Sequence, residues 1–113
     1  MQTTKHAEID SAIAQVAAGL TQLRALMQDP SDLSFELLHP HFEHLERALG
    51  NKAAIDAAFA FIAERDDAGR RVGSSKAKDY LTARLGLSES EAAARLRNGR
   101  NPVSYTHLRA HET

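Results

Sequence analysis

The chain has 113 residues, with 14 Lys and Arg, 15 Asp and Glu and no Cys, and its formal net charge is -1. This length suits one small domain, and the near-neutral charge excludes a strongly basic protein that wraps nucleic acid. The lack of Cys excludes disulfides and thiolate zinc sites. No apolar run approaches the ~18 residues that span a membrane, and the N-terminus lacks a signal-peptide profile, so we expect a cytoplasmic protein.

The first predicted helix is marked by apolar residues that recur every three or four positions. They form a narrow stripe of the kind that packs against a facing helix. The stripe therefore makes a homodimer through the Ile9–Met27 helix a candidate interaction. The helix should end at Asp29-Pro30, because the residue before a proline avoids the α region. The stripe consists of Ile9, Ile13, Val16, Leu20, Leu23 and Met27.

A second apolar stripe follows, and Pro40 interrupts it. Since proline is favoured at the first position of a helix, the pattern predicts a short helical turn up to Leu38. A separate helix should then run from Pro40 to about Leu49. Gly50-Asn51 should close it with a residue that is able to take a positive φ.

The segment Lys52–Arg65 is apolar almost all the way round. Such a helix is usually central and contacted on several sides. We expect its large side chains to face its neighbours, with its alanines allowing close approach. One predicted face carries Ile55, Phe59 and Ile62, and another carries Ala54, Ala58 and Phe61.

Residues 66–75 form a polar loop in this interpretation, and a helix–turn–helix pair follows from Lys76 to Asn98. Ser74 or Ser75 should cap its first helix, and Gly86-Leu87-Ser88 should form the turn. Ser88 and Glu91 fit a capping box. The complete pattern predicts an all-α fold, a small multi-helix bundle with a C-terminal helix–turn–helix-like pair. The pair should share a core of Leu81, Leu85, Leu87, Ala92 or Ala93, and Leu96.

The charges are unevenly distributed along the chain. Residues 1–63 hold four basic and eight acidic residues, whereas residues 64–100 hold nine basic and six acidic residues. A basic second half indicates an anionic partner, and the helix pair suggests DNA. Glu89 and Glu91 argue against this, because they lie near the end of the second helix that normally enters the groove. The candidate nucleic-acid-binding residues are Lys76, Lys78, Arg84, Arg95, Arg97 and Arg100.

No catalytic or metal site is predicted in residues 1–102. His41 and His44 share a helix face, but zinc needs three or four ligands and no third has a convincing spacing. The segment Gly69–Lys76 lacks the Gly-Lys-Ser/Thr run and the buried strand of a phosphate loop. We therefore expect no cofactor in this chain.

The segment Glu64–Arg100 resembles the actinobacterial 13E12 repeat family, also called domain of unknown function 222. The likeness rests on a Gly-containing basic loop, a Leu-Gly-Leu-Ser turn and the run Glu91-Ala92-Ala93-Ala94-Arg95-Leu96-Arg97, and it extends over residues 8–101. It implies an all-helical region that precedes an HNH nuclease domain, whose histidines bind a divalent metal. This chain holds no HNH motif, so the resemblance supplies no catalytic residue.

The last eleven residues, Val103–Thr113, resemble a translated sequencing adapter. We therefore expect residues 1–102 to be a truncated 13E12-type domain and residues 103–113 to be a non-native tail. The expected function is that of the helical region of an HNH-endonuclease-associated protein that contacts DNA, with no catalytic site in this fragment. Two alternatives stay open: a helix–turn–helix transcriptional regulator, and a structural or oligomerisation module that binds no nucleic acid.

Overall fold

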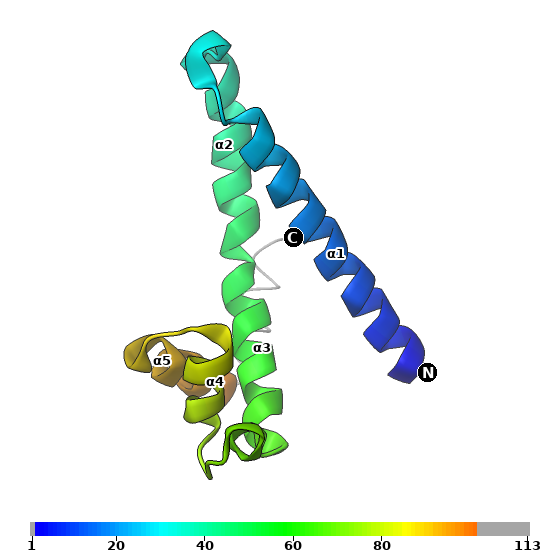
Figure 1. Cartoon of the computed structure of the whole chain (residues 1–113), viewed down its shortest axis with the longest axis vertical. Coiled ribbons are helices and arrows are strands. Elements are labelled where there is room, and N and C mark those ends of the chain that lie inside the picture. The colour runs from blue at the N-terminus through cyan, green and yellow to red at the C-terminus, as the bar shows by residue number, and fades with distance from the viewer. Residues whose placement is uncertain (1, 102–113) are drawn as a thin grey trace. The chain divides into compact units, whose positions relative to one another are not determined.

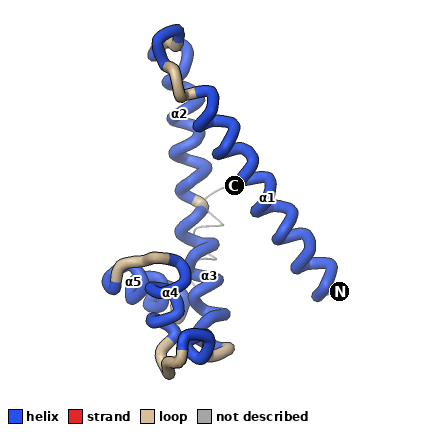
Figure 2. The backbone as a smooth tube through the Cα atoms, viewed as in Figure 1, coloured by secondary structure: helices blue, strands red, loops and turns tan. Residues whose placement is uncertain are grey.

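The computed structural model of the chain describes residues 2–101 (Figure 1). Helices joined by short turns make up this part of the chain, and it contains no strand, so the predicted all-α fold is confirmed (Figure 2). None of these described helices is long and apolar enough to cross a membrane. The elements are α1 (Gln2–Leu26), the 3-10 helix η1 (Pro30–Asp32), α2 (Phe35–Gly50), α3 (Lys52–Arg65), the 3-10 helix η2 (Ala68–Val72), α4 (Ala77–Leu85) and α5 (Glu89–Gly99).

The chain divides into two compact units, and the boundary falls inside α2, between Pro40 and His41. In the first unit, α1 ends at Leu26, shortly before Asp29-Pro30 as the sequence predicts. Asp29 then starts η1, because its carboxylate accepts hydrogen bonds from the backbone N–H (3.2 Å) and the hydroxyl (2.8 Å) of Ser31. These hydrogen bonds lower the pKa of Asp29.

Helix α2 corrects the prediction of two elements separated at Pro40, because it runs unbroken from Phe35 to Gly50. Pro40 is the sixth residue of the helix, so its missing N–H removes one hydrogen bond, the one to the Glu36 carbonyl, and the helix tolerates this. The junction with α3 also differs from the prediction. Asn51 has φ -67° and ψ -18°, so the chain passes into α3 in the right-handed helical region rather than through a left-handed cap.

Helix α3 has the predicted bounds, but its buried face is different from the predicted one. Ala57, Ala60 and Ala63 are the residues that it buries. Ile55 is 65% exposed, and Phe59, Phe61 and Ile62 are each more than 40% exposed. The alanines therefore allow close approach as predicted, whereas the large side chains are not buried against the neighbouring helices; of these, Phe59 still contacts Tyr80 of α4, with 6.4 Å between ring centroids.

That neighbour is α5, which crosses α3 at Gly99. A Cβ atom at Gly99 would lie 2.7 Å from the Ala57 carbonyl oxygen and 2.8 Å from the Phe61 backbone nitrogen. The backbone of α5 therefore packs directly on the backbone of α3, and small side chains fill the rest of the contact. The buried cluster beside it consists of Ala60, Leu81, Ala92 and Leu96, with Ala77, Tyr80 and Leu87 partly buried around it.

The predicted helix–turn–helix pair is present. Gly86 ends α4 with φ 70°, and the backbone N–H of Glu91 donates to the Ser88 hydroxyl (3.1 Å) at the start of α5. The Glu91 carboxylate binds Arg95, however, rather than completing the capping box (2.9 Å). Leu81, Ala92 and Leu96 form the shared core as predicted, whereas Leu85 is 44% exposed, which corrects its predicted place there.

The segment predicted as a polar loop holds η2 and packs on α4. Two residues in the left-handed region bracket η2, Asp67 (φ 56°) and Gly73 (φ 72°). The N-cap of α4 is Lys76, so the prediction of Ser74 or Ser75 is wrong by one or two positions. Ser74 supports the helix start indirectly, because its hydroxyl accepts from the Lys76 N–H (2.9 Å) and donates to the Asp79 carboxylate (2.5 Å).

We expect Gly99→Ala to destabilise the second unit by about 2 kcal/mol, because the added methyl group meets backbone atoms of α3 that cannot rotate away. The measurement is urea unfolding followed by far-ultraviolet circular dichroism. Gly50→Ala is the matched control: nothing lies within 4 Å of its Cβ position, so it should leave stability unchanged or raise it slightly. Equal effects of the two variants would contradict the close crossing.

Candidate nucleic-acid interface

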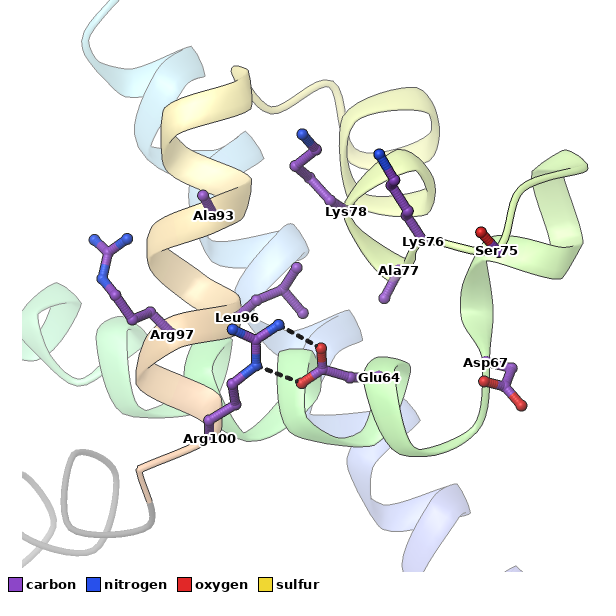
Figure 3. A pocket seen from close by; sticks show the side chains of 10 residues that line it. All are labelled: Glu64, Asp67, Ser75, Lys76, Ala77, Lys78, Ala93, Leu96, Arg97 and Arg100. Atoms are coloured by element: carbon purple, nitrogen blue, oxygen red, sulfur yellow. Dashed lines mark hydrogen bonds and ion pairs between the residues drawn. The ribbon is translucent and has the colours of Figure 1, made fainter.

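A cleft of about 440 Å³ opens beside the start of α4 and the C-terminal turns of α5 (Figure 3). Helix α4 begins here because Ser74 fixes the backbone just ahead of it, and α5 is held in place by its crossing with α3. Four basic and two acidic side chains line the cleft, together with Ser75, Ala77, Ala93 and Leu96. The charged ones are Lys76, Lys78, Arg97, Arg100, Glu64 and Asp67.

The structure thus brings together four of the six basic residues that the sequence singled out. Lys76 and Lys78 come from the start of α4, and Figure 3 shows their side chains projecting next to each other. Arg97 belongs to the last turn of α5, and Arg100 is its C-cap. Positive charges from two elements therefore meet at one opening, which is the arrangement that phosphate groups require.

Two of these four basic groups already have carboxylate partners. Arg100 binds Glu64 at the end of α3 in a two-pronged pair, with 2.9 Å from Nε to Oε1 and 2.6 Å from Nη2 to Oε2. This pairing lowers the pKa of Glu64 and raises the pKa of Arg100. Lys78 binds Glu89 with 2.7 Å between Nζ and Oε1, and the contact raises the pKa of Lys78.

Lys76 and Arg97 are the two cations of the cleft that have no carboxylate partner among residues 2–101. Both residues are exposed. In Figure 3 the Arg97 side chain points away from the Arg100–Glu64 pair. An incoming anion meets these two groups without first displacing a carboxylate.

Arg95 lies on the α3 side of α5, away from this cleft. Its side chain is 16% exposed, its Nη1 lies 3.5 Å from Asp56 Oδ1, and its Nε lies 2.9 Å from Glu91 Oε2. Asp56 also binds Lys52 at 2.8 Å. Arg95 therefore fastens α5 to α3, and its partners on two helices occupy the groups that a phosphate would need.

Arg84 is the sixth predicted residue, and it lies at another opening. Its Nη2 donates to the Arg71 carbonyl oxygen (3.2 Å), and both residues line a cleft of about 570 Å³ with Arg70, Phe59 and Tyr80. The structure therefore separates Arg84 from the group around Lys76.

The exposed surface of α5 holds both acidic and basic side chains. Ala92, Leu96 and Gly99 are buried, whereas Ser90, Arg97 and Asn98 are exposed. Glu89 and Glu91 lie in the first turn, where carboxylates stabilise the positive end of a helix. The long exposed side chains of α5 are thus Glu89, Glu91 and Arg97, and the two acidic ones lie at its N-terminal end.

Metal ligands are not gathered in the part of the chain that the structure describes, where no group of three His, Cys, Asp or Glu could hold an ion. His39 stacks on Phe35 with 5.3 Å between ring centroids. Residues 103–113, the predicted adapter-like tail, lie outside the described residues. Sequence reasoning missed Glu64, whose pairing with Arg100 joins residues far apart in the chain and leaves no local pattern.

Comparisons with known proteins identified no relative of this chain. No protein-family model matches the chain, and neither the curated proteins nor the solved structures contain a match.

The Glu64–Arg100 pair should make stability depend on pH. Because the folded pKa of Glu64 is lowered, the pair stabilises the fold above the unfolded carboxyl pKa of about 4.3, and this contribution is lost as the pH falls through the folded value. Both side chains are more than a third exposed, so we expect Glu64→Gln to cost less than about 1 kcal/mol at neutral pH. Urea unfolding of both proteins measures the difference, which should vanish in acid; a difference independent of pH would contradict this.

Proposed function

We propose that this chain is a non-catalytic helical module that contacts the phosphate backbone of DNA through the cleft between the start of α4 and the C-terminal turns of α5. The observation that carries the proposal is the meeting of Lys76, Lys78, Arg97 and Arg100 at one opening. Lysine and arginine side chains that neutralise phosphates release counterions, and this release drives association with nucleic acid.

The two ion pairs at the cleft are compatible with this role. Glu89 is 71% exposed and Arg100 is 62% exposed, so water screens both pairs and each contributes little to folding. A phosphate can therefore take the place of Glu89 at Lys78, or of Glu64 at Arg100, at small cost. Lys76 and Arg97 would make the first contacts, because neither has a carboxylate to release.

The positions of the charges favour contact with the phosphate backbone of DNA over recognition of a specific base sequence. In regulators of the helix–turn–helix type, the first turns of the second helix enter the major groove. Here those turns carry Glu89 and Glu91, which repel phosphates, and Arg95 is held against α3. Arg97 and Arg100 lie instead at the other end of α5, where contacts with phosphates suit binding that is independent of base sequence.

The resemblance to the 13E12 family gives this contact a context. It implies a helical region next to an HNH nuclease domain, and such a region would hold DNA for cleavage elsewhere. We propose this role as the reason for a cation cleft in a chain whose described residues offer no catalytic cluster.

The test is fluorescence anisotropy with a labelled random-sequence duplex over a series of salt concentrations. The wild type should bind with an affinity that falls steeply with salt. In Lys76→Ala/Arg97→Ala the salt slope should become shallower by about two, roughly one for each lost phosphate contact, and affinity in low salt should fall about tenfold.

Arg70→Ala/Arg71→Ala is the matched control, since it removes the same charge from exposed positions of η2 that do not line the cleft. It should weaken binding far less than the cleft variant. Equal losses in the two variants would indicate unspecific charge attraction and overturn the proposal. Undetectable binding by the folded wild type in low salt would favour the structural or oligomerisation module.

A further inference from the structure

Helix α1 presents its predicted apolar stripe to solvent. The six stripe residues are between 36% and 62% exposed, and Met27 continues the helical pattern because its N–H donates to the Leu23 carbonyl (2.9 Å). From Ile9 to Met27 the stripe is about 27 Å long, at 1.5 Å for each residue. A surface of this length and chemistry needs an apolar partner helix.

The spacing of the stripe is symmetric about residue 18. Counting outward from that point, residue 16 mirrors 20, residue 13 mirrors 23, and residue 9 mirrors 27. A helix with this property can pair with a second copy of itself running in the opposite direction, and every stripe position then meets another stripe position.

We propose that α1 is a self-association helix, and that two copies of the chain pair through it as an antiparallel coiled coil centred at residue 18. The pairing has three kinds of layer, each present twice because of the two-fold symmetry. They are Ile9 with Met27, Ile13 with Leu23, and Val16 with Leu20, where the second residue of each pair belongs to the other copy.

Side-chain shape favours this orientation. Each antiparallel layer combines one β-branched side chain, Ile or Val, with one that is not β-branched, Leu or Met. A parallel pair would place every residue opposite itself. In that register Ile13 at a and Leu23 at d suit a parallel two-stranded coil, but Ile9 and Val16 at d and Leu20 at a are the reverse of the arrangement that stabilises it.

The charges beside the stripe are also complementary. Asp10 and Arg24 lie on the same edge of the stripe, the side that follows each d position. In the antiparallel pair the Asp10 of each copy faces Arg24 of the other, with Ala17 opposite itself between them. Neither Asp10 nor Arg24 has an ion-pair partner within residues 2–101. On the other edge, Ala12 and Gly19 are small enough to let the helices approach closely.

A parallel pair would use the charges differently. It would bring Lys5 next to Asp10 of the other copy and leave Arg24 opposite Gly19. The antiparallel and parallel orientations therefore predict different effects of Arg24 on dimer affinity, and they bring different stripe residues into contact.

Disulfide trapping in the full-length chain tests the orientation, because the protein has no cysteine of its own. Ile13→Cys mixed with Leu23→Cys should form a covalent dimer under mild oxidation, since these positions share a layer. Ile13→Cys alone should remain largely uncrosslinked, because its two copies lie ten residues apart along the axis, about 15 Å, beyond the reach of a disulfide. Rapid crosslinking of Ile13→Cys with itself would overturn the antiparallel arrangement.

Charge exchange tests the same interface without cysteine. Analytical ultracentrifugation of the wild type should show a mass that rises with concentration from 12.4 kDa to twice that value. Asp10→Arg and Arg24→Asp should each raise the dissociation constant about fivefold in low salt, and an equal mixture of the two variants should dimerise at least as tightly as the wild type. Ser11→Arg, on the opposite side of α1, should leave the constant unchanged.

Two results of this second experiment would overturn the proposal. One is a wild type that stays monomeric at every concentration, which would mean that α1 does not self-associate. The other is a dimer that Asp10→Arg weakens while Arg24→Asp has no effect, which would indicate parallel pairing. Leu20→Glu places a carboxylate in two layers of the pair, so a dimer that survives this change would lie on another surface.

Discussion

The close approach of the α3 and α5 backbones at Gly99 is the contact on which the second unit depends. With so little space between the two helices, only small side chains fit: α3 buries Ala57, Ala60 and Ala63, and Ala60 packs in one cluster with Ala92 of α5. Leu81 and Leu96 are the only large aliphatic side chains that are buried among the described residues. Because few large side chains are buried, the second unit depends on the close packing of the two helix backbones. A single added methyl group at this contact therefore has a large effect on stability.

The crossing of α3 and α5 also determines which arginines at the C-terminal half of α5 pair with acidic residues of α3. Arg95 and Arg100 lie on two sides of the contact, and each finds an acid on α3, Asp56 and Glu64 respectively. Arg97 is exposed; it lines the same cleft as Lys76 and Lys78, and in the view of Figure 3 its guanidinium lies on the other side of α5 from them. The charge arrangement therefore follows from helix packing: Arg95 and Arg100 join α5 to α3, whereas Arg97 has no carboxylate partner among residues 2–101.

Local signals in the sequence predicted the elements well. Pro30 marks the end of α1, Gly86 ends α4, and Ser88 caps α5, because each acts through backbone atoms within a few residues. Packing was less predictable. The apolar pattern of α3 does not reveal that alanines rather than Ile55 or Phe59 are buried, since that choice depends on how closely a helix far along the chain approaches. For the same reason the sequence pattern indicates Arg95 and Arg97 alike, although Asp56 binds Arg95 and Arg97 has no ion-pair partner among residues 2–101.

A dimer that carries two cation clefts would bind DNA more tightly than a single chain that carries one. If the cleft binds phosphates as proposed, a few such contacts would give a single chain modest affinity that falls steeply with salt. If α1 joins two chains, the second cleft reaches the same DNA at an effective concentration set by the dimer, and the combined affinity exceeds that of either cleft without a new contact. The proposed self-association and the proposed phosphate contact involve different residues, so Leu20→Glu would weaken DNA binding while leaving every cleft residue in place. We expect Leu20→Glu to bind DNA more weakly, and we expect a covalent link between two variant chains to restore the affinity. That result would show that dimerisation through α1 strengthens DNA binding at the α4–α5 cleft.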